Sequence, residues 1–166
     1  CEIQALVTPA GYGIPARRIV GLEQNRVQLL IAVLTRRASC RLGDQDVFVN
    51  TVGGLRINDP ATDVPIALAL ASALWDQPIK ERLIAFGELS LSGELRPIPR
   101  LDLRLKEAKR LGYTHAITPP QPASTIDSLS LLQATTLSQA ISLAGLKPVH
   151  HAPTKHPREE IEGFYS

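Results

Sequence analysis

The chain has 166 residues, of which 44% are apolar and 20% charged, and its formal net charge is +2. This length fits one domain with its own core, and the apolar content excludes a chain that is disordered throughout. The longest nearly unbroken apolar stretch, residues 64–75, is too short to cross a bilayer, so no membrane segment is expected. The sequence starts at Cys1 and contains no Met, which predicts a fragment or a processed piece of a longer protein.

Hydrophobic periodicity predicts short strands alternating with amphipathic helices. Strands are expected over residues 2–8, 46–51, 115–118 and 131–135, with a hairpin formed by 83–91 and 93–98. Helices are expected over 24–38, 60–74, 100–111 and 138–144, and a turn-rich loop over 11–18. Asp59 and Pro60 have the pattern of a helix N-cap followed by Pro at the first helical position. This order predicts an α+β fold, an α/β sandwich with a mixed β-sheet.

The periodicity stops after Gly145, and the residues that follow are rich in Pro and His. We therefore expect one domain over residues 1–147 and a flexible tail over 148–166. The tail contains His150, His151 and His156, but it offers no scaffold to fix a coordination geometry, so no metal site is predicted.

Two further motifs bear on cofactor chemistry. Residues 11–16 match the dinucleotide fingerprint G-x-G-x-x-A, but the helix that would hold the pyrophosphate is expected only from about Gln24, which favours a simple turn. No G-x-x-x-x-G-K-[ST] phosphate loop is present. The cysteines, Cys1 and Cys40, are too few for a disulfide framework or a four-ligand zinc site and indicate a reducing, cytosolic compartment.

Two stretches, residues 49–64 and 86–98, together with the flanking helices resemble the proteolytic domain of Lon proteases. The match includes Gly-Glu-Leu-Ser-Leu-Ser-Gly at 87–93 and Pro-Ile at 97–98, in the family's order and spacing, and it covers about residues 2–145. The resemblance implies a Lon-like fold. It also implies where a Ser nucleophile and a Lys base would lie, because Lon-type proteolysis needs both groups.

Both positions of this Ser–Lys dyad carry other residues. The Ser of the family motif G-P-S-A-G falls on Ala61, and the Lys of G-G-L-K falls on Asp102. The resemblance therefore implies a domain that is not a protease. The alternative is an active peptidase with a displaced dyad of Thr62 and Lys106, although a shift of one residue turns a helical side chain by about 100°. Lys106 is also spaced to pair with Asp102 one helical turn away.

A narrower pattern joins Asn50-x-x-Gly-Gly-Leu-Arg to Asp-Pro-Ala and extends over residues 42–50 and 96–108. It resembles the C-terminal domain of the bacterial DNA-repair family RadA, also called Sms. The resemblance implies an ATP-driven motor for branch migration of recombination intermediates in the bacterial cytoplasm, at the nucleoid. ATP, Mg and Zn would be bound by upstream domains outside this chain, which itself would need no cofactor.

The same resemblance implies that this domain builds a hexameric ring and contacts single-stranded or branched DNA, with a recombinase and other recombination proteins as partners. Arg accounts for 13 of the 18 basic residues, and its planar fork suits phosphates. Two candidate DNA-binding sets are predicted, one around the first helix and one on the third: Arg17, Arg18, Arg26, Arg36, Arg37 and Arg41; and Arg100, Arg104, Lys109 and Arg110. Solvated faces or salt bridges between subunits, and hence a ring-forming scaffold without DNA contact, are the other interpretation.

Overall fold

The structure is a computed structural model that describes residues 1–11 and 13–149. It contains two three-stranded sheets and a short hairpin. The first sheet has the order β1-β3-β2, in which β1 is antiparallel and β2 parallel to β3: β1 (Ile3–Pro9), β2 (Arg17–Val20) and β3 (Gln45–Thr51). The second sheet is parallel, with the order β4-β7-β8: β4 (Leu83–Ala85), β7 (His115–Thr118) and β8 (Ser130–Gln133). The hairpin pairs β5 (Glu88–Leu89) with β6 (Leu95–Arg96).

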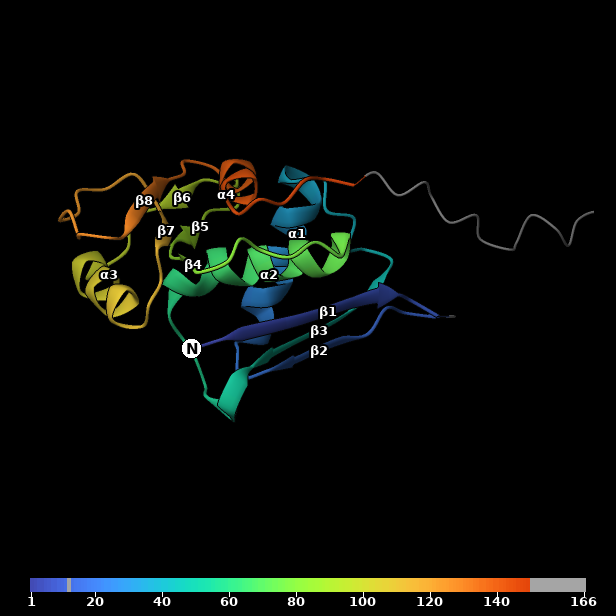
Figure 1. Cartoon of the computed structure of the whole chain (residues 1–166). Helices are drawn as coiled ribbons and strands as arrows, with labels where there is room; N and C mark the ends of the chain where they lie inside the picture. The colour runs from blue at the N-terminus through green and yellow to red at the C-terminus, as the bar shows by residue number, and fades with distance from the viewer. Residues whose placement is uncertain (12, 150–166) are drawn as a thin grey trace, which may run out of the picture.

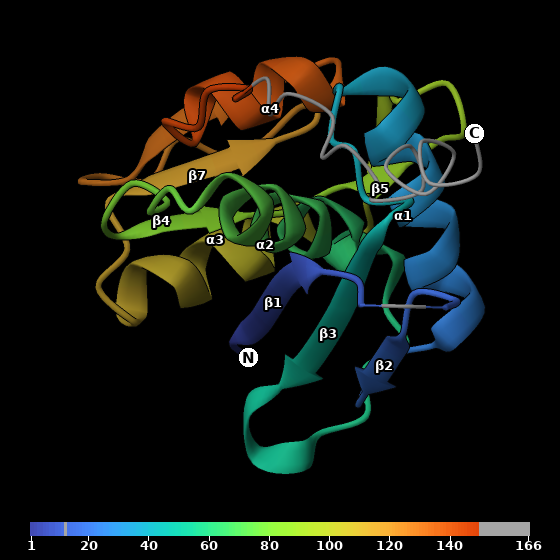
Figure 2. The ribbon, with the colours of Figure 1, turned by 90° about the vertical axis from the view of Figure 1, so that its right-hand side faces the viewer.

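Helix α2 lies at the centre of the molecule, against one face of the first sheet and beside α1 and α4 (Figures 1 and 2). The helices and two short 3-10 turns are α1 (Gln24–Arg37), η1 (Val52–Gly54), η2 (Pro60–Thr62), α2 (Asp63–Trp75), α3 (Leu101–Arg110) and α4 (Leu137–Leu143). Because α2 is apolar on nearly all sides, it can be covered from several directions, and eight of its residues are buried.

The second sheet is covered on both faces. Leu83 and Ile117 face the main core, which α1, α2 and α4 share with the first sheet. Ile84 and Ala116 face the opposite way, into a smaller core that α3 completes with Leu105. Consecutive strand residues thus point into different cores, as the alternation of a β-strand requires.

The predicted mixed α/β architecture is confirmed. The predicted helices are present within three residues of their expected ends, and the apolar residues that recur at three- and four-residue steps in α1 and α3 are buried, among them Val27, Leu34 and Leu105. Asp59 accepts a hydrogen bond from the Ala61 N–H at 3.0 Å, as predicted for a cap, although the first turn is 3-10 and the α-helix begins only at Asp63. The predicted tail lies from residue 150 onward outside the described residues.

Two sequence-based expectations about strands are wrong. The loop expected at 11–18 ends in a strand, because Arg17–Val20 pairs in parallel with β3. The hairpin expected from 83–91 and 93–98 forms only between β5 and β6, whereas Leu83–Ala85 pairs in parallel with β7. The break falls at Gly87, whose N–H donates to the Ala61 carbonyl at 3.0 Å and so turns the chain away from the second sheet.

An ion pair joins α1 to the start of α2. The Asp63 carboxylate, of which only 1% is exposed, accepts hydrogen bonds from the Arg26 Nε at 2.8 Å, from the Arg26 Nη2 and from the Leu89 backbone N–H at 2.9 Å. The bond to Asp63 raises the pKa of Arg26 above its ordinary value. Three elements, α1, α2 and β5, are thus held by one buried carboxylate.

Of the helices within the described residues, none is both long and apolar enough to span a membrane.

Replacement of Arg26 by Ala should destabilise the fold, because it leaves a buried carboxylate with a single hydrogen-bond donor. We expect the free energy of unfolding to fall by about 3 kcal/mol, the low end for a broken buried pair, since Arg26 is itself partly exposed. Urea denaturation followed by circular dichroism measures the change. Arg110→Ala is the matched control, because it removes a surface pair with Glu107 and should leave the urea midpoint unchanged. An equal loss in both variants would contradict this account.

The two cysteines should differ sharply in reactivity. Cys1 is exposed, whereas Cys40 is buried, and burial raises the pKa of the Cys40 thiol to about 12. At pH 8 we expect iodoacetamide to modify Cys1 alone in the folded chain and both thiols in urea, as read by mass spectrometry, because the thiolate is the reactive form.

The raised pKa of Cys40 also makes stability depend on pH. The free energy of unfolding keeps its full value below pH 9 and decreases as the pH rises towards 12, because the unfolded chain loses the thiol proton first. Cys40→Ala should remove that part of the pH dependence, and rapid native alkylation of Cys40 would refute the assignment.

Candidate functional site

The position of the expected nucleophile lies in η2, immediately before α2. Ala61 is 2% exposed, and its methyl group packs with Ile98 and Leu101 in the smaller core. Asp102, at the expected position of the base, is exposed, and its Oδ1 accepts the Ser124 N–H at 2.6 Å. These two positions therefore carry packing and backbone-capping roles in the structure.

The two groups of the displaced dyad have separate surroundings. The Thr62 hydroxyl donates to the Asp59 backbone carbonyl at 2.6 Å. Lys106 is exposed, and no hydrogen bond or ion pair links it to any residue that the structure describes. The pairing of Lys106 with Asp102 that their spacing predicts is therefore absent here, since Asp102 instead binds the loop at Ser124.

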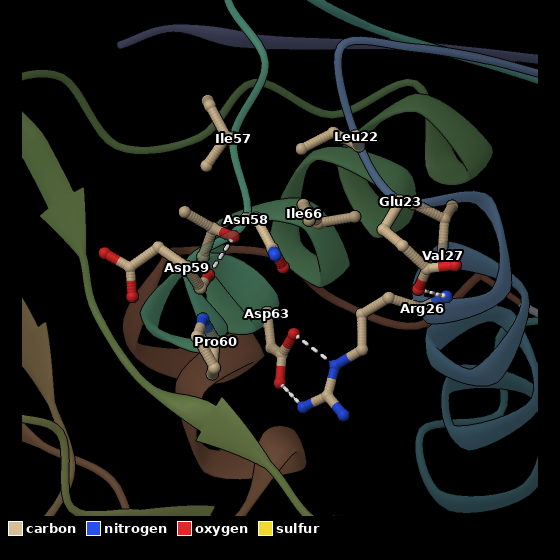
Figure 3. A pocket seen from close by; sticks show the side chains of 11 residues that line it. Leu22, Glu23, Arg26, Val27, Ile57, Asn58, Asp59, Pro60, Asp63 and Ile66 are labelled. Atoms are coloured by element: carbon tan, nitrogen blue, oxygen red, sulfur yellow. Dashed lines mark hydrogen bonds and ion pairs between the residues drawn. The ribbon is translucent and has the colours of Figure 1, made fainter.

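Two guanidinium–carboxylate pairs flank Ala61. Arg26 reaches Asp63 from α1, and Arg104 of α3 reaches Asp59, with 2.7 Å between Nη2 and Oδ2. Figure 3 shows the first pair at the side of a cavity of about 200 Å³, whose polar lining also includes Glu23 and Asn58. The pairs fix both ends of the turn that precedes α2, so this region is held rigidly.

The candidate DNA-binding residues fall into two groups in the structure. Four of them have guanidinium groups engaged with the protein itself: Arg26 and Arg104 as above, Arg110 with Glu107, and Arg17 with the backbone carbonyls of Leu42 and Gln45. Six are exposed, and their side chains bind nothing among residues 1–11 and 13–149: Arg18, Arg36, Arg37, Arg41, Arg100 and Lys109. Only the second group offers free charge to a phosphate.

These free charges do not form one surface. Arg36 and Arg37 end α1, with Arg41 just beyond, whereas Arg100 immediately precedes α3 and Lys109 lies within it, at the other end of the molecule (Figures 1 and 2). The α1 group is the denser one.

The aliphatic part of the Arg37 side chain, its stem, is packed, whereas its guanidinium group is exposed. Its backbone carbonyl accepts the Ser138 hydroxyl at 3.1 Å, which ties the end of α1 to α4. Gly93, with a φ of +86°, forms the turn between β5 and β6 and approaches so closely that a Cβ there would lie 3.1 Å from the Arg37 Cβ. The turn thus packs against the stem of Arg37 and leaves the guanidinium exposed.

The segment at 11–16 leads into β2, so no helix N-terminus follows it to hold a pyrophosphate. Within the part of the chain that the structure describes, no three His, Cys, Asp or Glu side chains gather as metal ligands.

The roles of Asp59 and Asp63 in ion pairs were missed in the sequence analysis. A signal was available for Asp63, because an acidic residue in the first turn of an otherwise apolar helix needs a partner when that helix is buried. Nothing in the spacing identifies Arg26 as that partner, since 37 residues separate the two.

Comparison with known proteins gives a consistent assignment. Residues 7–122 match the family described as subunit ChlI of Mg-chelatase. DNA repair proteins named RadA from Aquifex aeolicus and Escherichia coli are each 41% identical, over 142 and 144 residues that make up 86% of this chain. The RadA of Salmonella typhimurium is 46% identical over 118 residues, or 71% of the chain.

The matched regions make up 32%, 31% and 26% of those three relatives, so the chain spans about a third of their length at most. The chain belongs to the family that the ChlI model describes, and over most of its length it is similar to the bacterial DNA repair proteins named RadA.

Proposed function

We propose that this chain is the non-proteolytic, Lon-like part of an ATP-driven bacterial DNA repair protein. The observation that carries the proposal is the 41% identity to proteins named RadA over 86% of the chain. In this proposal the longer protein is a motor for branch migration of recombination intermediates in the bacterial cytoplasm. Its ATP, Mg and Zn are bound outside this chain.

Within that protein, the domain contacts DNA and assembles into a hexameric ring. Six of the candidate DNA-binding side chains are exposed and have no partner among the described residues, which supports phosphate contact, and Arg suits it because it is always charged and presents several donors. Contacts of this kind bind the backbone without reading sequence. An aromatic content of 4% gives little material for base stacking along a single strand. A recombinase and other recombination proteins would meet the assembled motor.

Absence of proteolysis is part of the proposal. A methyl group at Ala61 offers no nucleophile, and the Thr62 hydroxyl donates to a backbone carbonyl. A Ser–Lys mechanism requires a hydroxyl in hydrogen-bond reach of an amine that takes its proton.

Reversal of charge at the end of α1 should weaken DNA binding without changing assembly. For Arg36→Glu with Arg37→Glu, we expect at least tenfold lower affinity for labelled single- and double-stranded DNA in fluorescence anisotropy. The dependence of log K on log salt should become shallower by about 1.4 to 1.8, since each lost phosphate contact contributes about 0.7 to 0.9.

Arg56→Glu with Arg82→Glu makes the same charge change at exposed residues outside both candidate sets and serves as the control. Light scattering reports the assembly size of each variant. Loss of the ring in the α1 variant would assign Arg36 and Arg37 to a subunit interface instead. If the unmodified chain fails to bind DNA even at low salt, the domain is a scaffold without DNA contact.

The chain should hydrolyse neither casein nor fluorogenic peptides, because no hydroxyl is paired with an amine at the Lon-like site. The assay compares the chain with Thr62→Ala and Lys106→Ala, and the three should be equally inactive. Hydrolysis that disappears in either variant would overturn the non-proteolytic assignment and establish the displaced dyad.

A further inference from the structure

The first sheet is covered on one face only. Helix α2 and the main core lie against the side that carries Ala5 and Val49, and no described helix or strand lies against the other side (Figures 1 and 2). Because side chains alternate along a strand, Leu6, Phe48 and Val20 point to that outer side. Leu6 is 58% and Val20 56% exposed. Large apolar side chains gathered on an open face mark a surface that another segment can cover.

The register of the strands brings these side chains together. Phe48 of β3 lies opposite Leu6 of β1 and, on its other side, opposite Arg18 of β2. Val20 comes two residues after Arg18 and therefore points to the same side of β2. A shallow hollow of about 620 Å³ spans the three strands, and its lining includes all four residues. These four residues thus form one continuous surface, the outer face of the first sheet.

The charges around the hollow balance, but they are unevenly placed. Arg18 is the one ionisable side chain in the lining, and it has no ion-pair partner among residues 1–11 and 13–149. Asp46 lies on the same side of β3 and accepts a backbone N–H at 2.7 Å. Glu2 accepts a hydrogen bond from Gln4 at 3.1 Å, next to the Cys1 amine. The outer face therefore selects no net charge, but it offers an acidic group a place at Arg18.

The outer face is too small for an independent partner. Eight residues line the hollow, whereas a stable interface takes about 20 to 30 residues from each side. A segment tethered to the same chain meets the surface at an effective concentration of about millimolar, so it needs far less contact area. The size of the hollow therefore favours a segment of this chain over a second copy or another protein.

Residues 159–166 have a composition that suits this surface, with the sequence Glu-Glu-Ile-Glu-Gly-Phe-Tyr-Ser. Aromatic residues are scarce, since the chain has three Phe, three Tyr and one Trp, yet Phe164 and Tyr165 are adjacent. Three glutamates and no basic residue accompany them. The segment thus combines large apolar side chains for the outer face with carboxylates for Arg18.

The connection to this segment is long enough. The described residues end at Val149, after α4, and α2 lies between α4 and the first sheet (Figure 1). The path from α4 past α2 and the sheet covers about 30 Å, because packed layers lie about 10 Å apart. The 14 residues from 150 to 163 span up to about 46 Å when extended. Phe164 can therefore reach the outer face of its own molecule.

We propose that residues 159–166 fold back onto the outer face of the first sheet, where Phe164 and Tyr165 cover its apolar side chains and a glutamate pairs with Arg18. Burial of the two aromatic rings favours this contact, and ordering of the segment opposes it. The docked segment also takes Arg18 out of the charges that a phosphate can reach. The inference depends neither on DNA contact nor on assembly into a ring.

Alkylation of a cysteine placed on the outer face measures the cover. The reporter Val20→Cys is introduced together with Cys1→Ser, and Cys40 is buried. This chain is compared with one that also carries Phe164→Ser and Tyr165→Ser. We expect iodoacetamide to modify the reporter about tenfold more slowly when both aromatic residues are present, because a segment that is docked most of the time shields the thiol.

Leu111→Cys is the matched control reporter, because Leu111 is 58% exposed and follows α3, beside the smaller core. Its alkylation rate should be the same with and without the two aromatic residues. Arg18→Glu should raise the rate at the Val20 reporter by at least about twofold, since it replaces an attraction for the glutamates by a repulsion. Equal rates at the Val20 reporter with and without the aromatic residues would overturn the proposal.

A disulfide separates docking within one chain from docking between chains. Val20→Cys with Tyr165→Cys, in the Cys1→Ser chain, should close within the monomer under mild oxidation, as read on a non-reducing gel. Closure should be at least about tenfold faster than for Leu111→Cys with Tyr165→Cys, because docking raises the local concentration of the two thiols. Disulfide-linked dimers as the main product would show that the segment covers a neighbouring copy, and they would refute docking within the chain.

Discussion

The bidentate contact between Arg26 and Asp63 is the constraint on which the arrangement of the molecule depends. A carboxylate that is 1% exposed is tolerated only when its charge and its lone pairs are satisfied. The hydrogen-bond donors to this carboxylate are Arg26 of α1 and the backbone N–H of Leu89. The Asp63 side chain therefore fixes the positions of α1, α2 and the β5–β6 hairpin relative to one another. The register of α2 is then set, together with the turn from Asp59 to Thr62 that opens it.

The same demand for charge pairing divides the basic residues into structural and available ones. Arg26 and Arg104 face carboxylates that the fold has partly or fully removed from water, and Arg17 binds backbone carbonyls at the start of β3. A count of Arg residues therefore overstates the charge open to a ligand. The exposed remainder at the end of α1 also lies where the helix dipole is negative, so these cations stabilise the helix as well.

Patterns that depend on neighbours in sequence were predicted well, and pairings between distant segments were not. The apolar faces of α1 and α3 follow from the 3.6-residue period, and the cap at Asp59 follows from local chemistry. The strand at 17–20 has only four residues, and its partner β3 lies about 30 residues later, so no local signal announces it. The sequence from Leu83 to Leu91 predicts one continuous strand. Nothing in it indicates that the Gly87 N–H bonds to the Ala61 carbonyl and so interrupts the strand.

The contacts made at the candidate site did not follow from the sequence. Ala61 and Asp102 were identified by resemblance, and their buried methyl group and backbone contact became visible only in three dimensions. The partners of Asp59 and Asp63 lie 45 and 37 residues away along the chain, beyond the reach of any periodicity.

The close approach of Gly93 to Arg37 has an entropic consequence. A free Arg side chain samples many rotamers, and an anion that captures it must suppress them at a cost of up to about 2 kcal/mol. The stem of Arg37 is already confined by the β5–β6 turn, so much of that loss has occurred during folding. An oxyanion that meets the guanidinium there encounters a partly ordered receptor, which binds more strongly than a solvated Arg of equal charge.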